Sequence, residues 1–153
     1  MPEPTPDSKN ALHPDATMLA RITIDALERT AFVLADPADD PQALPPISTT
    51  ASIDYSGPCN GGIDLVASAG FGRNLAASLL GCEPSEVSDS TAAEAVRELA
   101  NIVGGSMILE LGGTNCCYSL GLPRTSASPR KNLVESCVLN AEGERLEVHV
   151  IAA

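Results

Sequence analysis

The sequence has few aromatic side chains, few basic side chains and no long apolar run. Only 3% of its 153 residues are aromatic and none is tryptophan, so platforms for stacking nucleic-acid bases are nearly absent. Nine Lys and Arg stand against twenty Asp and Glu, and the net charge of -11 repels phosphate backbones and anionic membrane surfaces. We therefore expect no nucleic-acid and no membrane partner. A protein with a basic patch would be attracted, although such charge also simply keeps a protein in solution.

Signals for export, membrane insertion and zinc binding are also missing. No apolar run approaches the roughly 18 residues that a membrane span needs, and the first residues, MPEPTPDSKNALHPDA, are polar and proline-rich, unlike a signal peptide. The sequence thus predicts a cytoplasmic protein. Five cysteines form no CxxC pair, and only His13 and His149 could supply imidazole ligands. We expect neither a zinc site nor a cysteine nucleophile.

The length fits one domain with an aliphatic core. Residues 1–15 contain four prolines and few apolar groups, too few to offset the entropy lost on ordering, so we expect a disordered N-terminal tail. Residues 16–153 should form the single domain. Its pattern predicts an α+β fold, because runs of strands alternate with helices and few βαβ signals occur.

Periodicity and turn residues predict the individual elements. A first helix begins near a cap at Asp15 or Thr17, continues to Leu34 and ends before Pro37. A second helix ends at a C-cap glycine, Gly81. The remaining expected elements are a loop over 36–46, a hairpin of strands 47–55 and 63–68, a strand over 114–122, and a hairpin of strands 133–139 and 145–151.

A central amphipathic helix carries the most informative residues. At 100° per residue, the apolar positions of 91–103 fall on one stripe, whereas Glu94, Glu98 and Asn101 fall on the opposite one. Periodicity alone ends this helix at Gly104-Gly105, because each interior glycine costs about 1 kcal/mol relative to alanine.

Glu98 and Asn101 point outward together from a rigid element. A carboxylate only accepts hydrogen bonds, while a carboxamide donates and accepts, so the two side by side suit gripping a cation and orienting a water. Neither is a strong nucleophile. Such residues on an ordinary helix are most often solvated surface groups, and Thr91-x-x-Glu94 fits a capping box that would explain Glu94.

The string Glu98-Leu-Ala-Asn101-Ile-Val-Gly104-Gly-Ser-Met-Ile-Leu109, followed by Cys117-Tyr-Ser-Leu-Gly-Leu-Pro123, resembles the signature of the CheX branch of the CheC, CheX and FliY chemotaxis phosphatases. Those proteins pair an ExxN helix with a strand ending in a leucine-proline step. The similarity extends loosely over residues 17–151. It implies a mostly antiparallel sheet with long helices packed on one face. It also implies a central helix that continues to about Leu111, its glycines allowing close packing.

The resemblance further implies an activity. Such a protein hydrolyses the aspartyl phosphate of a CheY-like response regulator, with Asn101 orienting the attacking water and Glu98 paired with the regulator's active-site lysine. Mg²⁺ is expected on the regulator, and no cofactor on this chain. The first helix reads Glu28-Arg-Thr-Ala31 without an asparagine, so one active site per chain is expected, as in CheX. A homodimer paired through the late strands is also expected.

Two other classes of function remain open. The same fold can serve as a non-catalytic docking module in a motility or signalling complex. Alternatively, ExxN is coincidental in an unrelated enzyme or scaffold, in which case Glu98 and Asn101 should be buried or turned apart.

Overall fold

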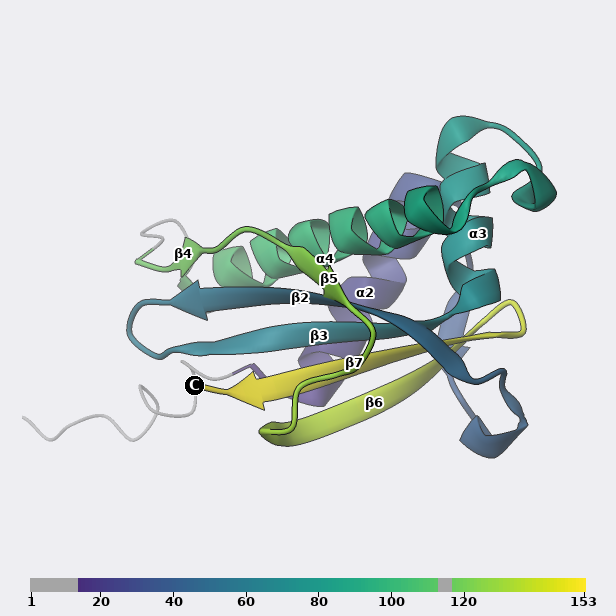
Figure 1. The fold of residues 1–153 in the computed structure, drawn as a ribbon. Helices are drawn as coiled ribbons and strands as arrows, with labels where there is room; N and C mark the ends of the chain where they lie inside the picture. Colours follow the sequence, from purple (N-terminus) through teal and green to yellow (C-terminus); the bar gives the residue numbers. More distant parts are fainter. Residues whose placement is uncertain (1–13, 113–116) are drawn as a thin grey trace, which may run out of the picture.

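The computed structural model describes residues 14–112 and 117–153. Within them the chain forms three α-helices and a seven-stranded sheet in which every strand pair is antiparallel (Figure 1). The strand order is β1-β6-β7-β3-β2-β4, and β5 also pairs with β2. The elements are α2 (Ala16–Ala31), β1 (Ala35–Pro37), η1 (Pro41–Ala43), β2 (Ile47–Ser56), β3 (Gly61–Ser68), α3 (Ala69–Leu80), η2 (Pro84–Glu86), α4 (Asp89–Gly112), β4 (Ser119–Leu120), β5 (Arg124–Ser126), β6 (Leu133–Ala141) and β7 (Glu144–Ala152).

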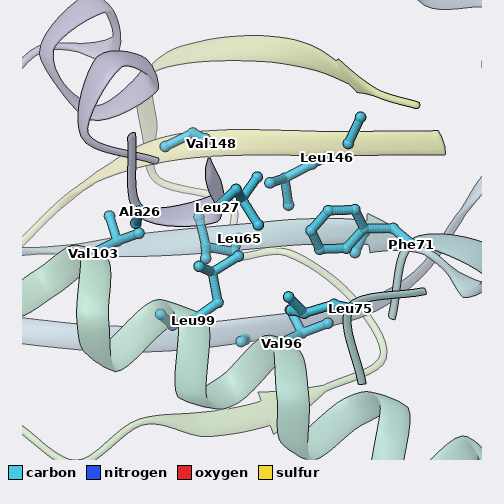
Figure 2. Close-up of a cluster of buried hydrophobic side chains, with 14 of the residues drawn as sticks. Ala26, Leu27, Leu65, Phe71, Leu75, Val96, Leu99, Val103, Leu146 and Val148 are labelled. Carbon is cyan, nitrogen blue, oxygen red and sulfur yellow. The ribbon is translucent and has the colours of Figure 1, made fainter. Parts of the chain in front are cut away.

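The helices cover one face of the sheet, which confirms the expected α+β fold (Figure 1). Successive strand residues face opposite sides, so Ile63, Leu65 and Ala67 of β3 meet the helices while Asp64 faces away. Figure 2 shows the resulting core, in which aliphatic side chains from the three helices and from β3 and β7 pack together, with Phe71 at one end of the cluster. This core holds α4 rigidly against the sheet.

Five of the expected elements, four strands and one helix, are confirmed with small shifts. β2 and β3 form the first hairpin, and β6 and β7 form the last. The last hairpin turns at Glu142 and Gly143, which both have positive φ, as a two-residue turn of type I′ requires. Helix α3 ends at the left-handed Gly81, whose N–H donates to the carbonyl of Ala77.

The first helix is shorter than expected. Asp15 caps it by accepting from the N–H of Met18 at 2.7 Å, but it ends at Ala31 because Phe32 is left-handed and the chain turns into β1. Part of the expected loop 36–46 is regular, since it contains the end of β1 and all of η1. Of the expected tail, residues 1–13 lie outside the described residues.

The expected strand over 114–122 is confirmed only in part. Residues 114–116 lie outside the described range, and only Ser119 and Leu120 form a strand, paired with the end of β2. The strand β5 follows Pro123 and pairs with the middle of β2. Two short strands therefore share the β2 edge where periodicity predicted one long strand.

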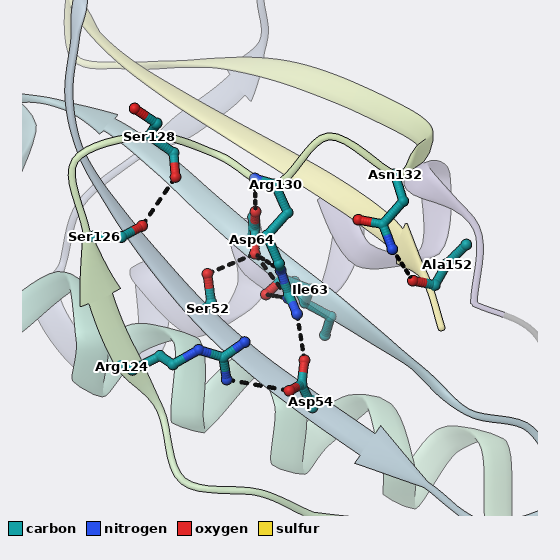
Figure 3. Close-up of polar contacts among 10 residues, drawn as sticks. All are labelled: Ser52, Asp54, Ile63, Asp64, Arg124, Ser126, Ser128, Arg130, Asn132 and Ala152. Atoms are coloured by element: carbon teal, nitrogen blue, oxygen red, sulfur yellow. Dashed lines mark hydrogen bonds and ion pairs between the residues drawn. The ribbon is translucent and has the colours of Figure 1, made fainter.

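A connection from β5 to β6 crosses the helix-free face of the sheet (Figures 1 and 3). Its Arg130 donates from the backbone N and from Nε to the fully buried carboxylate of Asp64, at 2.8 and 2.9 Å. The Oγ of Ser52 donates to the same carboxylate at 2.7 Å. Arg130 also pairs with Asp54, which Arg124 reaches at 3.1 Å. We call these five residues the Arg130 cluster.

Candidate functional site

The residues singled out by sequence lie on α4. This helix begins at Asp89, and the N–H of Thr91 donates to the Oγ of Ser88 at 3.1 Å. Ser88 therefore caps the helix, and the capping box expected at Thr91 is wrong. Glu94 consequently has no capping role, and its side chain lies exposed on the helix surface.

Helix α4 does not stop at the glycine pair. It continues to Gly112, as the family resemblance implied, and the end predicted at Gly104-Gly105 is wrong. Tertiary packing explains Gly104, because a Cβ there would lie 3.0 Å from the Cδ1 of Leu120 and 3.4 Å from the Cγ2 of Ile53. The close approach of β2 and β4 to the helix compensates for the poor helix propensity of this glycine.

Packing fixes which side of α4 faces outward. Its core side is buried against the sheet and the other helices, through Val96, Leu99, Ala100, Val103 and Met107. Glu94, Glu98 and Asn101 are all exposed. Residues three or four apart on a helix are surface neighbours, so these side chains form one row. We call these three residues the α4 stripe.

Ion pairs hold the two ends of α4 but not its middle. Arg73 of α3 contacts Asp89 at 2.7 Å, and Arg21 of α2 pairs with Glu110. Exposed pairs of this kind stabilise only modestly, so the packing of the core side determines how α4 lies against its neighbours. Among the described residues, neither Glu94 nor Glu98 makes an ion pair, and the carboxamide of Asn101 has no hydrogen-bonding partner. The α4 stripe is thus free to bind another molecule.

An open groove of about 260 Å³ adjoins Glu98. Its α4 wall contains Glu94 and Glu98, and its α3 wall contains Leu79 and Leu80, whose exposures are 47% and 64%. Sequence reasoning did not identify these leucines. Their adjacency was no signal, because consecutive helix residues such as Leu99 and Ala100 can both be buried. A partner that reaches Glu98 would also meet this apolar edge.

The chemistry of the α4 stripe is that of positioning rather than of nucleophilic attack. The carboxylate of Glu98 can accept hydrogen bonds from a cationic group, while the carboxamide of Asn101 can accept a hydrogen bond from one group and donate one to another. Among the residues described, no His, Cys, Asp and Glu side chains gather in a group of three or more suited to a metal ion. No helix in the described parts of the chain has the length and apolar character of a membrane span.

Several solved structures with this α+β arrangement are chemotaxis proteins. Chemotaxis protein CheX from Vibrio vulnificus superposes with a TM-score of 0.72 at 14% identity, over 87% of this chain and 92% of that one. A CheX from Desulfovibrio desulfuricans superposes with a TM-score of 0.67 at 15% identity, over 88% of this chain and 96% of that one. A chain of the CheX-CheY-BeF3-Mg²⁺ complex from Borrelia burgdorferi superposes with a TM-score of 0.62 at 14% identity, over 87% of this chain and 94% of that one.

These identities are low enough that the superpositions establish the fold alone. A comparison with curated proteins finds no match. The family comparison is more specific, because residues 49–133, more than half of the chain, match the family described as chemotaxis phosphatase CheX. The matched range contains the whole α4 stripe. The chain belongs to the CheX family, within the group of CheC, CheX and FliY proteins.

Proposed function

We propose that this chain hydrolyses the aspartyl phosphate of a CheY-like response regulator, with Glu98 and Asn101 as its catalytic residues. The observation that carries this proposal is the α4 stripe: in a CheX-family chain, the carboxylate and the carboxamide lie exposed on a rigid helix without partners among the described residues. Membership of the family and the CheX-CheY complex from Borrelia burgdorferi support the choice of partner.

Asn101 positions the nucleophile. Its carboxamide oxygen accepts a hydrogen bond from a water placed in line with the phosphorus, and its NH₂ group donates to a phosphoryl oxygen. The water oxygen forms the new bond to phosphorus as the bond to the aspartate oxygen breaks, which yields inorganic phosphate and a free carboxylate on the regulator. Positioning and charge stabilisation account for most of the catalysis of phosphoryl transfer, so one correctly placed carboxamide is sufficient.

Glu98 anchors the complex. Its carboxylate pairs with the active-site lysine of the regulator, and this contact sets the depth to which Asn101 enters the site. Because the two side chains project from adjacent turns of one helix, docking of the first orients the second. Mg²⁺ belongs to the regulator in this scheme, and this chain contributes no cofactor. Both proteins act in the cytoplasm.

The decisive test is phosphate release from regulators encoded in the same genome. Each purified regulator is phosphorylated on its aspartate, and the rate of loss of the label is measured with and without this chain. We expect accelerated hydrolysis for at least one regulator. A docking module without catalytic activity would bind that regulator and leave its rate of dephosphorylation unchanged. The unrelated-protein alternative has less support, because Glu98 and Asn101 are neither buried nor turned apart.

We also propose that the protein is a homodimer joined at β6. Strand β7 lies between β6 and β3, so it offers no edge, contrary to the expectation that both late strands do. β1 pairs only with Leu139–Ala141, so among the described strands nothing covers the outer edge of 133–137, where Leu133 and Val134 are exposed. Such an edge is a template for a second copy. Light scattering should give twice the chain mass, and Val134→Lys should give one chain per particle.

A further inference from the structure

Two consecutive glycines of α4 have different surroundings. A Cβ at Gly104 would lie 3.0 Å from Leu120 and 3.4 Å from Ile53, tighter than an ordinary contact, so packing favours a glycine there. A Cβ at Gly105 would meet no described residue within 4 Å. The β-carbon of a side chain at position 105 would therefore meet no steric obstacle among the described residues. The intramolecular packing that explains one glycine leaves the other unexplained.

The backbone does not require a glycine at position 105 either. Gly105 lies inside a regular 24-residue helix, and among the described glycines those with positive φ are Gly57, Gly81 and Gly143. Glycine is unfavourable in a helix interior, because its unfolded backbone has more freedom to lose and it buries no side-chain surface. Alanine at 105 would strengthen the helix. The missing side chain thus lowers helix stability without a compensating contact among residues 14–112 and 117–153.

Gly105 continues the α4 stripe. It follows Asn101 by four residues and Glu98 by seven, so at 100° per residue the three positions lie in one row. At a rise of 1.5 Å per residue, Gly105 is about 6 Å further along the helix axis than Asn101. The row consequently presents a carboxylate, then a carboxamide, and then an open stretch of helix surface.

We propose that Gly105 is the point of closest approach between α4 and the response regulator, where the loop that carries the phosphoryl group lies against the helix backbone beside Asn101. This inference rests on the proposed function and adds a positioning residue to it. A side chain at 105 would hold that loop away from the helix and withdraw the phosphorus from the reach of the Asn101 carboxamide. A displacement of about 1 Å from a reactive geometry can reduce a rate by about 10².

The test uses side chains of increasing size in the full-length protein. Gly105→Ala and Gly105→Leu are compared with Ser78→Leu, which places the same leucine on an exposed surface of α3 outside the α4 stripe. Three quantities are measured for each variant: the melting temperature, kcat/KM for dephosphorylation, and the affinity for the regulator activated with beryllofluoride. Gly105→Ala should melt about 2–4 °C higher than the wild type, yet lose at least about tenfold in kcat/KM.

Gly105→Leu should lose more activity than Gly105→Ala, and it should also bind the activated regulator more weakly. Ser78→Leu should retain wild-type values for both. If Gly105→Leu retains the wild-type affinity and kcat/KM, or if Gly105→Ala lowers the melting temperature, the inference is overturned while the roles of Glu98 and Asn101 stand. If the wild type binds the regulator without hydrolysing it, the proposed catalysis fails, and weaker binding by Gly105→Leu still supports the contact. A wild type that neither binds nor hydrolyses any regulator of its genome removes both.

Discussion

The two sides of the sheet use the same kinds of polar side chain in opposite ways. On the helix-free side, the carboxylate of Asp64 is fully buried and accepts hydrogen bonds from Ser52 and from both the backbone and the guanidinium of Arg130. On the helical side, the carboxylate of Glu98 is exposed and has no ion-pair partner among the described residues. A carboxylate whose accepting sites are already occupied cannot bind another molecule. An unpartnered carboxylate on a rigid helix can.

This difference separates structure from function. The Arg130 cluster fastens the β5–β6 connection across β3 and β2, so its hydrogen bonds contribute to the stability of the fold (Figure 3). The α4 stripe contributes little to stability, because its side chains contact no described residue through an ion pair or hydrogen bond. Substitutions in the two regions should therefore change different measured quantities.

The largest effect is expected for Arg130→Ala. This change leaves the carboxylate of Asp64 buried without its charged partner, so the free energy of unfolding should fall by about 3 kcal/mol. Urea denaturation followed by circular dichroism measures this loss. Arg124→Ala is the matched control, because the Arg124–Asp54 pair is half exposed and should contribute less than about 1 kcal/mol.

For the folded fraction of Arg130→Ala, the rate of regulator dephosphorylation should equal that of the wild type. A loss below about 1 kcal/mol, or a lower turnover by molecules shown to be folded, would contradict the division between the two regions.

The next largest effect is expected for the α4 stripe and concerns rate rather than stability. Asn101→Ala should lower kcat about 10²-fold, or about 2.7 kcal/mol of activation free energy, with KM nearly unchanged, because a water-positioning group acts in the transition state. Glu98→Ala should lower kcat and raise KM, because the anchor acts in binding as well. Titration of the phospho-regulator against each variant yields the two constants separately.

Glu28→Ala is the matched control for these variants, since Glu28 is exposed on α2 and has no ion-pair partner among the described residues. It should retain both constants. Neither Asn101→Ala nor Glu98→Ala should lower the melting temperature, because alanine is the better helix former. Wild-type turnover by Asn101→Ala would remove the proposed mechanism.

Local patterns predicted much of the fold. Alternation identified the two hairpins, Gly81 identified the end of α3, and the 100° spacing placed Glu98 and Asn101 on the outer side of α4. The errors occurred where distant residues decide local structure. The helix continues through Gly104 because Leu120 and Ile53 pack against it, and no feature near residue 104 reports these contacts.

The Arg130 cluster was not predictable for the same reason. Asp64 lies in an otherwise apolar strand, and the arginine that pairs with it follows 66 residues later on a connection without regular structure. A charged residue within a buried strand was the available signal, because a buried carboxylate requires a partner. The sequence does not indicate which of the nine basic residues supplies it.

The smallest predicted effect concerns the acid stability of the Arg130 cluster. Partial burial acts to raise the pKa of Asp54, but hydrogen bonds and charge from Arg130 and Arg124 outweigh it, so this pKa lies below its ordinary value of 3.8. The folded state therefore favours the ionised form. The resulting stability is complete above about pH 4 and is lost as the pH falls through the lowered pKa.

Asp54→Asn removes this contribution, which we place below about 1 kcal/mol because the side chain of Asp54 is half exposed and screened by solvent. Urea unfolding of the wild type and of Asp54→Asn between pH 2 and 6 measures the difference in stability. That difference should be constant above about pH 4 and shrink toward zero below it. A difference that stays constant down to pH 2 would mean that the charge of Asp54 contributes nothing to fastening the β5–β6 connection. The stability of the cluster would then come from the buried carboxylate of Asp64 with its hydrogen bonds from Ser52 and Arg130, and only this carboxylate would contrast with the α4 stripe.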